Sequence, residues 1–233
     1  MTENADACGI APTKRRPTWL WLTAWLVLGL VCILFDPVIQ PYLTRLGQVM
    51  PVRVVAKHWQ ELGATTGIVL FLLAAAGFAW HDRGRTFVRF GIGLAAAGLA
   101  VQILKHVVGR VRPNDVGDAS VFVGPNNPFT RHAWQLDSMP SGHATAAFAM
   151  AIMLTWRWPR LSWLWFLAAA GVGASRVLVD RHFPSDVLIG AWLGVMVSRR
   201  VNNRWPQTTK DDEESSLDQC MCLKPSKQRF GHE

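Results

Sequence analysis

Long apolar stretches constrain this chain more than any other feature of its sequence. The first runs from Trp19 to Phe35 without a charged residue, a second from Leu62 to Trp80 is also uncharged, and a third from Phe87 to Leu104 contains only Arg89. A helix crosses the hydrocarbon core of a bilayer with about 17–25 apolar residues. These stretches therefore predict membrane-spanning helices rather than the core of a soluble domain.

Three further apolar stretches follow in the second half of the chain. They run from Gly142 to Trp156, from Trp163 to about Leu178 and from Pro184 to Ser198, while the third stretch continues to about Val108. We therefore expect an all-α, polytopic membrane protein whose six transmembrane helices occupy residues 18–200. An N-terminal tail, 1–17, and a polar C-terminal tail, 201–233, which we expect to be disordered, flank this domain.

The segment between the first two spans, Asp36 to Glu61, has a mixed composition. Its prolines at 37, 41 and 51 predict that it breaks into short pieces. Apolar residues between Tyr42 and Met50 are typical of a short amphipathic helix on the membrane surface, and an ordered loop is the alternative. Trp19 to Phe35 is long for a signal peptide and lacks a small-residue cleavage site, so we interpret it as the first span.

The positive charge of the chain, formally +8, follows the loops between the spans. Membrane topology explains this pattern better than binding to nucleic acid does, so no nucleic-acid partner is predicted. Eleven basic residues lie on one side of the membrane and nine on the other, or six once three candidate site residues are set aside. The positive-inside rule then puts both termini in the cytoplasm. The four cysteines suggest no structural disulfide, and no cluster predicts a metal site.

Three polar clusters lie at the ends of apolar spans, all on the outer face in this topology. Charged groups beside apolar spans are costly, which favours a functional interpretation. The first cluster is Lys105 with Arg112, whose cations suit phosphate oxygens. The second is Pro140-Ser141-Gly142-His143 at a helix start. Ser141 there can cap the helix or donate to phosphate, the Gly142 N–H can bind an anion, and His143 can protonate a leaving oxygen.

The third cluster consists of Ser175-Arg176, His182 and Asp186. His182 and Asp186 are four residues apart, so they share one face of a helix. Asp186 would accept a hydrogen bond from one ring nitrogen of His182 and leave the other free to attack. Arg176 requires a turn to approach them. Each cluster alone also fits a plainer role: a snorkelling lysine, a capped helix with a solvated histidine, or an interfacial His–Asp pair.

Together the clusters resemble the three-part signature of the type-2 phosphatidic acid phosphatases, which share a fold with bacterial acid phosphatases and vanadium haloperoxidases. The signature is Lys, six residues, Arg-Pro; then Pro-Ser-Gly-His; then Ser-Arg, five residues, His, three residues, Asp. The matching residues span Lys105 to Asp186, and no position departs from the signature.

The resemblance implies a hydrolase of lipid phosphates that needs neither metal nor cofactor. His182 would be the nucleophile and form a phosphohistidine, Asp186 would orient it, and His143 would be the general acid. The phosphoryl oxygens would be held by Lys105, Arg112, Ser141, Gly142 and Arg176. The partners would be the bilayer and a membrane lipid phosphate, on the outer side of the cytoplasmic (inner) membrane.

Several alternatives remain open at this point. Undecaprenyl diphosphate, phosphatidylglycerol phosphate, phosphatidic acid and lipid A are all compatible substrates, and the motifs set neither this choice nor an oligomeric state. The same residues would serve a phosphotransferase in which another lipid accepts the phosphoryl group. A lipid transporter with a cationic headgroup path is disfavoured by the spacing of the two histidines and the aspartate, and a haloperoxidase by the membrane spans. A metal hydrolase is a further alternative, which predicts loss of activity with a chelator.

Overall fold

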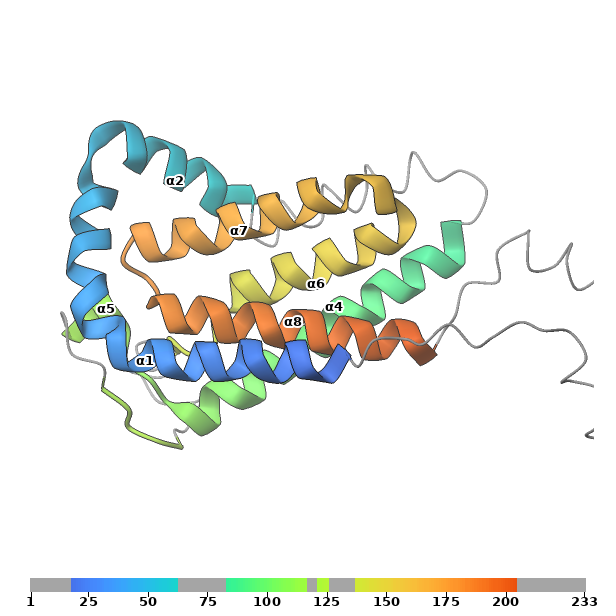
Figure 1. Ribbon diagram of the computed structural model, residues 1–233, viewed down its shortest axis with the longest axis horizontal. Helices are drawn as coiled ribbons and strands as arrows, with labels where there is room; N and C mark the ends of the chain where they lie inside the picture. The colour runs from blue at the N-terminus through green and yellow to red at the C-terminus, as the bar shows by residue number, and fades with distance from the viewer. Residues whose placement is uncertain (1–17, 63–82, 117–120, 126–136, 205–233) are drawn as a thin grey trace, which may run out of the picture.

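The computed structural model describes residues 18–62, 83–116, 121–125 and 137–204 (Figure 1). Within these residues the chain is helical, and its only β-type pairings are isolated bridges from Arg110 to Phe122 and Asp137. The all-α prediction is confirmed for this part of the chain. The predicted span from Leu62 to Trp80 and both predicted tails lie almost entirely outside the described residues.

The helices are α1 (Thr18–Gln48), α2 (Met50–Leu62), α4 (Arg83–Val108), α5 (Pro113–Val116), α6 (Gly142–Arg157), η1 (Pro159–Leu161), α7 (Ser162–Leu178) and α8 (Pro184–Arg204).

Helix α6 lies at the centre of the bundle and packs against α4, α7 and α8. Its side chains from Ala149 to Leu154 are buried. With 16 residues it is short for crossing a bilayer alone, but its neighbours cover most of its apolar surface. Helix α8 also packs against α1 and α4, so α6 and α8 form the inner pair of the bundle.

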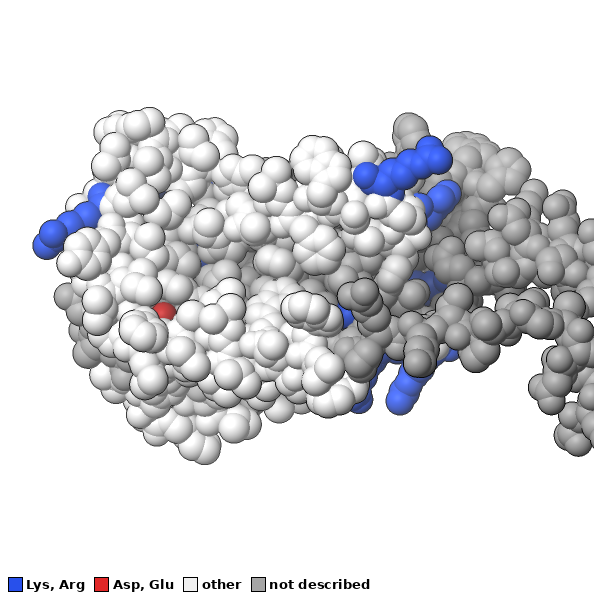
Figure 2. Space-filling view, in the orientation of Figure 1, with Lys and Arg blue, Asp and Glu red and all other residues white. Residues whose placement is uncertain are grey.

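Three described helices are long and apolar enough to cross a membrane, namely the segments Trp19–Gln48, Val88–Val108 and Pro159–Leu178. Large apolar side chains on them are exposed, including Trp21, Leu34, Leu99 and Trp163. Figure 2 shows that Lys and Arg gather toward the two ends of the molecule, whereas the surface between is nearly free of charge. This distribution suits a bundle whose middle faces lipid and whose ends face water.

The segment after the first span differs from the prediction. Pro37 and Pro41 lie inside α1 rather than ending it. Helix α1 first runs along α8 and then turns toward α2 (Figure 1), as expected where prolines remove intrahelical hydrogen bonds and kink a helix. Tertiary contacts hold the kinked part, because the buried side chains of Asp36 and Gln40 bond to residues near α7 and α8.

The amphipathic helix is α2, which begins near the point where the sequence predicted it to end. Its Val52, Ala56 and Trp59 line a cleft against α7, whereas Arg53 and Lys57 are exposed. Pro51 lies in its first turn, where the missing N–H costs little. Helix α8 is also longer than predicted, ending at Arg204 rather than at Ser198.

A close contact joins the starts of α6 and α8. The Ser141 N–H donates to the Asp186 carbonyl oxygen at 3.0 Å. A Cβ atom added to Gly190 would lie 2.6 Å from the Ser141 carbonyl oxygen, closer than real Cβ atoms come. Glycine at this position therefore allows the two helices to approach closely enough for their first turns to form one side of a site.

Candidate active site

Four helix ends meet at one end of the bundle, on the left in Figure 1. They are the ends of α4 and α7 and the starts of α6 and α8. Lys105 lies in the last turn of α4, His143 in the first turn of α6, Arg176 in the last turn of α7 and Asp186 in the first turn of α8. The three clusters, far apart in sequence, thus reach the same end of the structure.

The turn between α7 and α8 carries His182 to this end. The Arg181 N–H donates to the Arg176 carbonyl at 3.1 Å and the Asp180 N–H donates to the Val177 carbonyl at 3.0 Å, the pattern of a Schellman C-cap. Asp180 has a φ of 59°, a conformation that usually favours glycine. Its carboxylate accepts from Gln40 at 2.8 Å and from Thr44 at 2.9 Å, which offsets the cost.

His182 is oriented differently from the sequence prediction. Its Nδ1 lies 2.7 Å from the Ser138 carbonyl oxygen, so Nδ1–H donates to the backbone. The nearest Asp186 oxygen is 3.9 Å from Nδ1, too far for a hydrogen bond although within ion-pair range. The imidazole is buried, and burial lowers the pKa of His182 to about 4 despite the nearby Asp186 carboxylate. His182 is therefore neutral at neutral pH.

Asp186 is held by neighbours other than His182. Its Oδ2 accepts from the Ser138 hydroxyl at 2.6 Å and from the Phe183 N–H at 2.9 Å, and its Oδ1 accepts from Arg110 at 2.6 Å. Ser138 thus contacts both members of the predicted pair, through its carbonyl to His182 and through its hydroxyl to Asp186. The two are coupled through one residue rather than through a direct hydrogen bond.

Arg110 is a site residue that the sequence prediction missed. It is completely buried and bridges two carboxylates, with Nη2 2.7 Å from Asp36 and Nη1 2.6 Å from Asp186. Its Nη1 also donates to the Ser185 hydroxyl at 2.7 Å, and its guanidinium stacks on the Phe183 ring at 4.0 Å from the ring centre. The available signal was Asp36, a carboxylate directly after an apolar span, where charge is costly.

The three predicted phosphate-binding cations come from three different elements. Lys105 is mostly buried, with its Nζ 4.0 Å from Asp137. Arg112 precedes α5, and Arg176 is 6% exposed. Burial, together with the charge of Arg181, lowers the pKa of Arg112. Several cations at one bundle end repel each other, an arrangement that a bound anion would relieve.

The start of α6 carries the second cluster. Ser141 is buried and caps the helix, accepting from the Ala144 N–H at 3.5 Å. Of the two roles predicted for Ser141, the structure shows the cap. Gly142 is the first helical residue, and His143 follows, half-buried. Charges near His143 that act on its imidazole include those of Arg176, Lys105 and Arg112.

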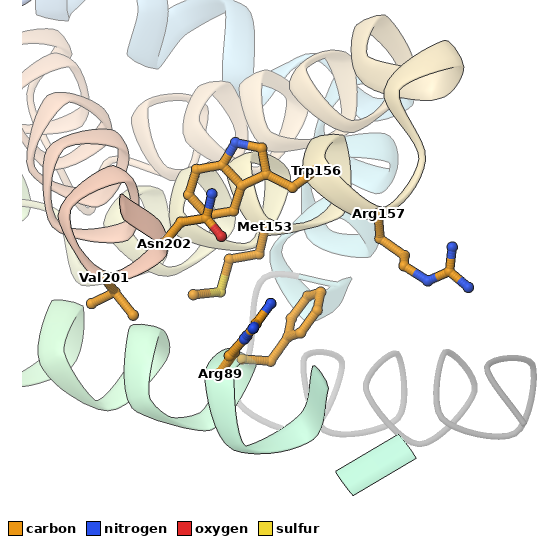
Figure 3. Close-up of a pocket in the computed structure, with 7 residues that line it drawn as sticks. Arg89, Met153, Trp156, Arg157, Val201 and Asn202 are labelled. Carbon is orange, nitrogen blue, oxygen red and sulfur yellow. The ribbon is translucent and has the colours of Figure 1, made fainter. Parts of the chain in front are cut away.

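The opposite end of the bundle offers no comparable cluster in the described residues. A small pocket there is lined by Arg89, Phe90, Met153, Trp156, Arg157, Val201 and Asn202 (Figure 3). Its volume of about 20 Å³ is room for a single water molecule. In the described part of the chain, no group of three or more His, Cys, Asp or Glu residues is arranged to hold a metal ion.

The chain is similar to proteins of known activity. The lipid A 1-phosphatase of Rhizobium johnstonii is 33% identical over 148 residues, which cover 57% of this chain and 59% of that protein. The chain therefore spans about three fifths of the length of this relative.

Two solved structures share the fold. The structure of Aquifex aeolicus LpxE matches with a TM-score of 0.56 and 20% identity, covering 71% of this chain and 93% of that one. A PAP2-type phosphatidylglycerolphosphate phosphatase from Bacillus subtilis matches with a TM-score of 0.58 and 21% identity, covering 82% of this chain and 98% of that one.

The family model of the PAP2 superfamily matches residues 86–210, more than half of the chain and all three polar clusters. Since the match includes the helix ends that meet at the candidate site, the chain belongs to the PAP2 superfamily.

Proposed function

We propose that this protein is an integral membrane phosphatase that hydrolyses lipid phosphates at the cluster around His182. The observation that carries the proposal is the meeting of four helix ends, which brings two histidines and three cations to one end of a membrane-type bundle. Membership of the PAP2 superfamily and similarity to a lipid A 1-phosphatase support this reaction. The substrate would be a membrane lipid that carries a phosphate monoester or a diphosphate.

In the first half of the proposed reaction, His182 attacks phosphorus. Its Nδ1–H is held by the Ser138 carbonyl, which leaves Nε2 as the attacking nitrogen. The N–P bond forms while the P–O bond to the lipid breaks, and His143 gives its proton to the departing lipid oxygen. Lys105, Arg112 and Arg176 bind the phosphoryl oxygens, together with the Gly142 N–H at the helix start and the predicted Ser141 contact.

In the second half, water attacks the phosphohistidine. His143 now takes a proton from the water, the N–P bond breaks with its electrons returning to His182, and inorganic phosphate leaves. Asp186 acts through Ser138 and Arg110, since it fixes the hydroxyl of the residue whose carbonyl orients His182. Neither step uses a metal or a cofactor.

The proposed topology has six membrane-spanning helices, with both termini in the cytoplasm and the site at the outer face of the cytoplasmic membrane. Supporting it, the described chain begins with α1 and ends with α8 at the same end of the bundle, opposite the site (Figure 1). With Lys105, Arg112 and Arg176 set aside as site residues, eleven basic residues of the sequence fall on the proposed cytoplasmic side and six on the other, which fits the positive-inside rule.

Phosphate release by the detergent-purified protein tests the proposal, with EDTA present and with His182→Ala as the matched variant. The panel would contain undecaprenyl diphosphate, phosphatidylglycerol phosphate, phosphatidic acid and lipid A. We expect EDTA-resistant release that disappears in His182→Ala. Release that persists in the variant would exclude His182 as nucleophile, and release that requires a second lipid as acceptor would favour a phosphotransferase.

A further inference from the structure

A polar pocket of about 700 Å³ lies beside the candidate active site without including its predicted catalytic residues. It is enclosed by the end of α1, by α2 and by the turn from α7 to α8. These elements meet at the upper left of Figure 1, where α2 lies over the end of α7. Arg181, which lines the pocket, directly precedes His182 in the chain, so the pocket lies at the site end of the bundle.

Three cations line this pocket: Arg53, Lys57 and Arg181. Arg53 and Lys57 are four residues apart on α2, so both project from the same face of the helix. All three side chains belong to exposed residues, and among the described residues none of them forms an ion pair with a carboxylate. A hollow lined by unneutralised cations attracts anions.

The one carboxylate in the lining, Asp180, does not cancel these cations. Its Oδ1 accepts hydrogen bonds from Gln40 and Thr44 on α1 at 2.8 and 2.9 Å. The carboxylate is therefore engaged in holding the turn, and the pocket keeps two positive charges in excess, three cations against one anion. Gln48 and Gln60 add amide groups, which can donate hydrogen bonds to the same anion.

Arg181 connects this pocket to the phosphate site. It directly precedes His182 in the turn, and its charge acts on Arg112 strongly enough to contribute to the lowered pKa of that residue. The cations of the pocket and of the phosphate site therefore lie within electrostatic range of one another.

An apolar cleft adjoins the polar pocket and indicates that the ligand is a lipid. It has a volume of about 400 Å³ and lies between α2 and α7, where Val55, Trp59 and Ala174 contribute to its walls. Leu178 lines both the cleft and the polar pocket. An amphiphile would find a surface for an acyl chain on one side of α2 and for an anionic headgroup on the other.

We infer that the pocket of Arg53, Lys57 and Arg181 binds a second anionic group of the lipid substrate, so that the enzyme prefers lipids whose headgroup carries another phosphate besides the one removed. This inference rests on the proposed function, because it places the reacting phosphate at His182. It narrows the substrate class from lipid phosphates in general to lipids with two phosphate groups.

Two probe lipids with identical acyl chains test it. Phosphatidylglycerol phosphate has a terminal phosphate and a phosphodiester, whereas phosphatidic acid has a terminal phosphate alone. The variant Arg53→Gln/Lys57→Gln should reduce kcat/KM for phosphatidylglycerol phosphate by about tenfold and for phosphatidic acid by less than about twofold, since exposed charged contacts are each worth a modest amount. The matched control is Arg45→Gln/Arg160→Gln, which removes the same charge from exposed residues outside the pocket.

The inference would be overturned if the pocket variant lost the same factor in kcat/KM on both lipids. It would also be overturned if the control variant lost as much kcat/KM on phosphatidylglycerol phosphate as the pocket variant does. Either result would show a general effect of surface charge. Binding of both lipids in nanodiscs to the His182→Ala protein, with and without the pocket substitutions, separates the pocket from catalysis. Selective binding of phosphatidylglycerol phosphate that depends on Arg53 and Lys57, without turnover by the unmodified protein, would support the pocket and reject the proposed function. Turnover of both lipids without selective binding of phosphatidylglycerol phosphate would reject the pocket and support the proposed function.

Discussion

Arg110 lies 2.6 Å from Asp186 and 2.7 Å from Asp36, and all three side chains are shielded completely from solvent. The guanidinium therefore joins the kinked part of α1 to the first turn of α8, and it stacks on Phe183, the residue after His182. Two carboxylates close together in a buried place would repel each other, and Arg110 is the cation between them. The position of Asp186 in α8 therefore depends on Arg110, which lies in the sequence between Lys105 and Arg112, the two cations of the first cluster.

Replacing Arg110 by Met should remove activity and destabilise the fold. Breaking a buried ion pair leaves uncompensated charge and costs about 3–5 kcal/mol. Arg110→Lys keeps the charge but cannot reach two carboxylates at once, so we expect it to fold and to lose most of its kcat. Phosphate release and thermal unfolding in detergent would be compared with Arg45→Met, an exposed arginine near the end of α1. Normal kcat in Arg110→Lys would show that the bridge does not position the site.

Substituting His143 should produce a defect that depends on the leaving group. If His143 protonates the departing lipid oxygen, His143→Gln should slow hydrolysis of an alkyl phosphate by about 10²–10⁴-fold. The p-nitrophenolate group of p-nitrophenyl phosphate leaves without a proton, so its release in the first turnover, before His143 is needed as a base for water, should fall much less. His182→Ala should abolish both reactions, and equal losses in the first-turnover release of both leaving groups in His143→Gln would contradict its role as general acid.

The helices that hold the clusters were predictable because each cluster adjoins a continuous apolar stretch. Spacing alone also indicated that Arg176 needed a turn to approach His182, and the Schellman cap supplies that turn. Hydrogen bonds to residues in loops were not predictable in this way. Ser138 orients His182 through a backbone carbonyl, a group that every residue possesses and that no sequence pattern marks.

The course of α1 was predicted incorrectly for a related reason. Proline propensity favours a break at Pro37 and Pro41, but the tertiary bonds of Asp36 and Gln40 keep the helix continuous. These partners are Arg110 and Asp180, which are distant in sequence. Local propensity is a weak indicator where buried polar bonds decide the conformation.

The titration of His182 should affect stability at mildly acid pH. Its pKa in the folded protein is about 4, below the ordinary value of 6.5, because burial disfavours the charged ring. The unfolded chain therefore binds the proton more tightly, and folding stability is lost as pH falls from about 6.5 to 4. The loss is about 3 kcal/mol for this group. Unfolding measured against pH should show a smaller loss in His182→Gln, and identical profiles would contradict the lowered pKa.

The pH dependence of catalysis should follow the same group. A neutral His182 is needed for attack. Protonation of His182 should therefore leave the rate of phosphate release nearly unchanged down to about pH 5 and lower it as the pH approaches 4. The matched comparison is single-turnover phosphohistidine formation against pH, which separates attack from product release. An apparent pKa near 6.5 for the attack step would show that the imidazole is solvated in the working enzyme.

The contact between α6 and α8 predicts that alanine at position 190 lowers stability and kcat, whereas alanine at position 91 does not. Gly190→Ala would place a Cβ atom 2.6 Å from the Ser141 carbonyl oxygen, so the helices must separate. We expect a cost of about 1–3 kcal/mol in the free energy of unfolding and a lower kcat, because the bond from Ser141 to Asp186 would lengthen. Thermal unfolding and phosphate release would measure the two effects.

Gly91→Ala is the control for this substitution, since Gly91 lies in α4 and a Cβ atom there meets nothing within 4 Å. Alanine is the better helix former by roughly 0.5–1 kcal/mol, so this variant should be at least as stable as the unmodified protein, with unchanged kcat. If the two variants behaved alike, close packing at Gly190 would not determine the geometry of the site. If only Gly190→Ala lost kcat, the distance between the first turns of α6 and α8 would be what sets the positions of His143 and Asp186 relative to the phosphate.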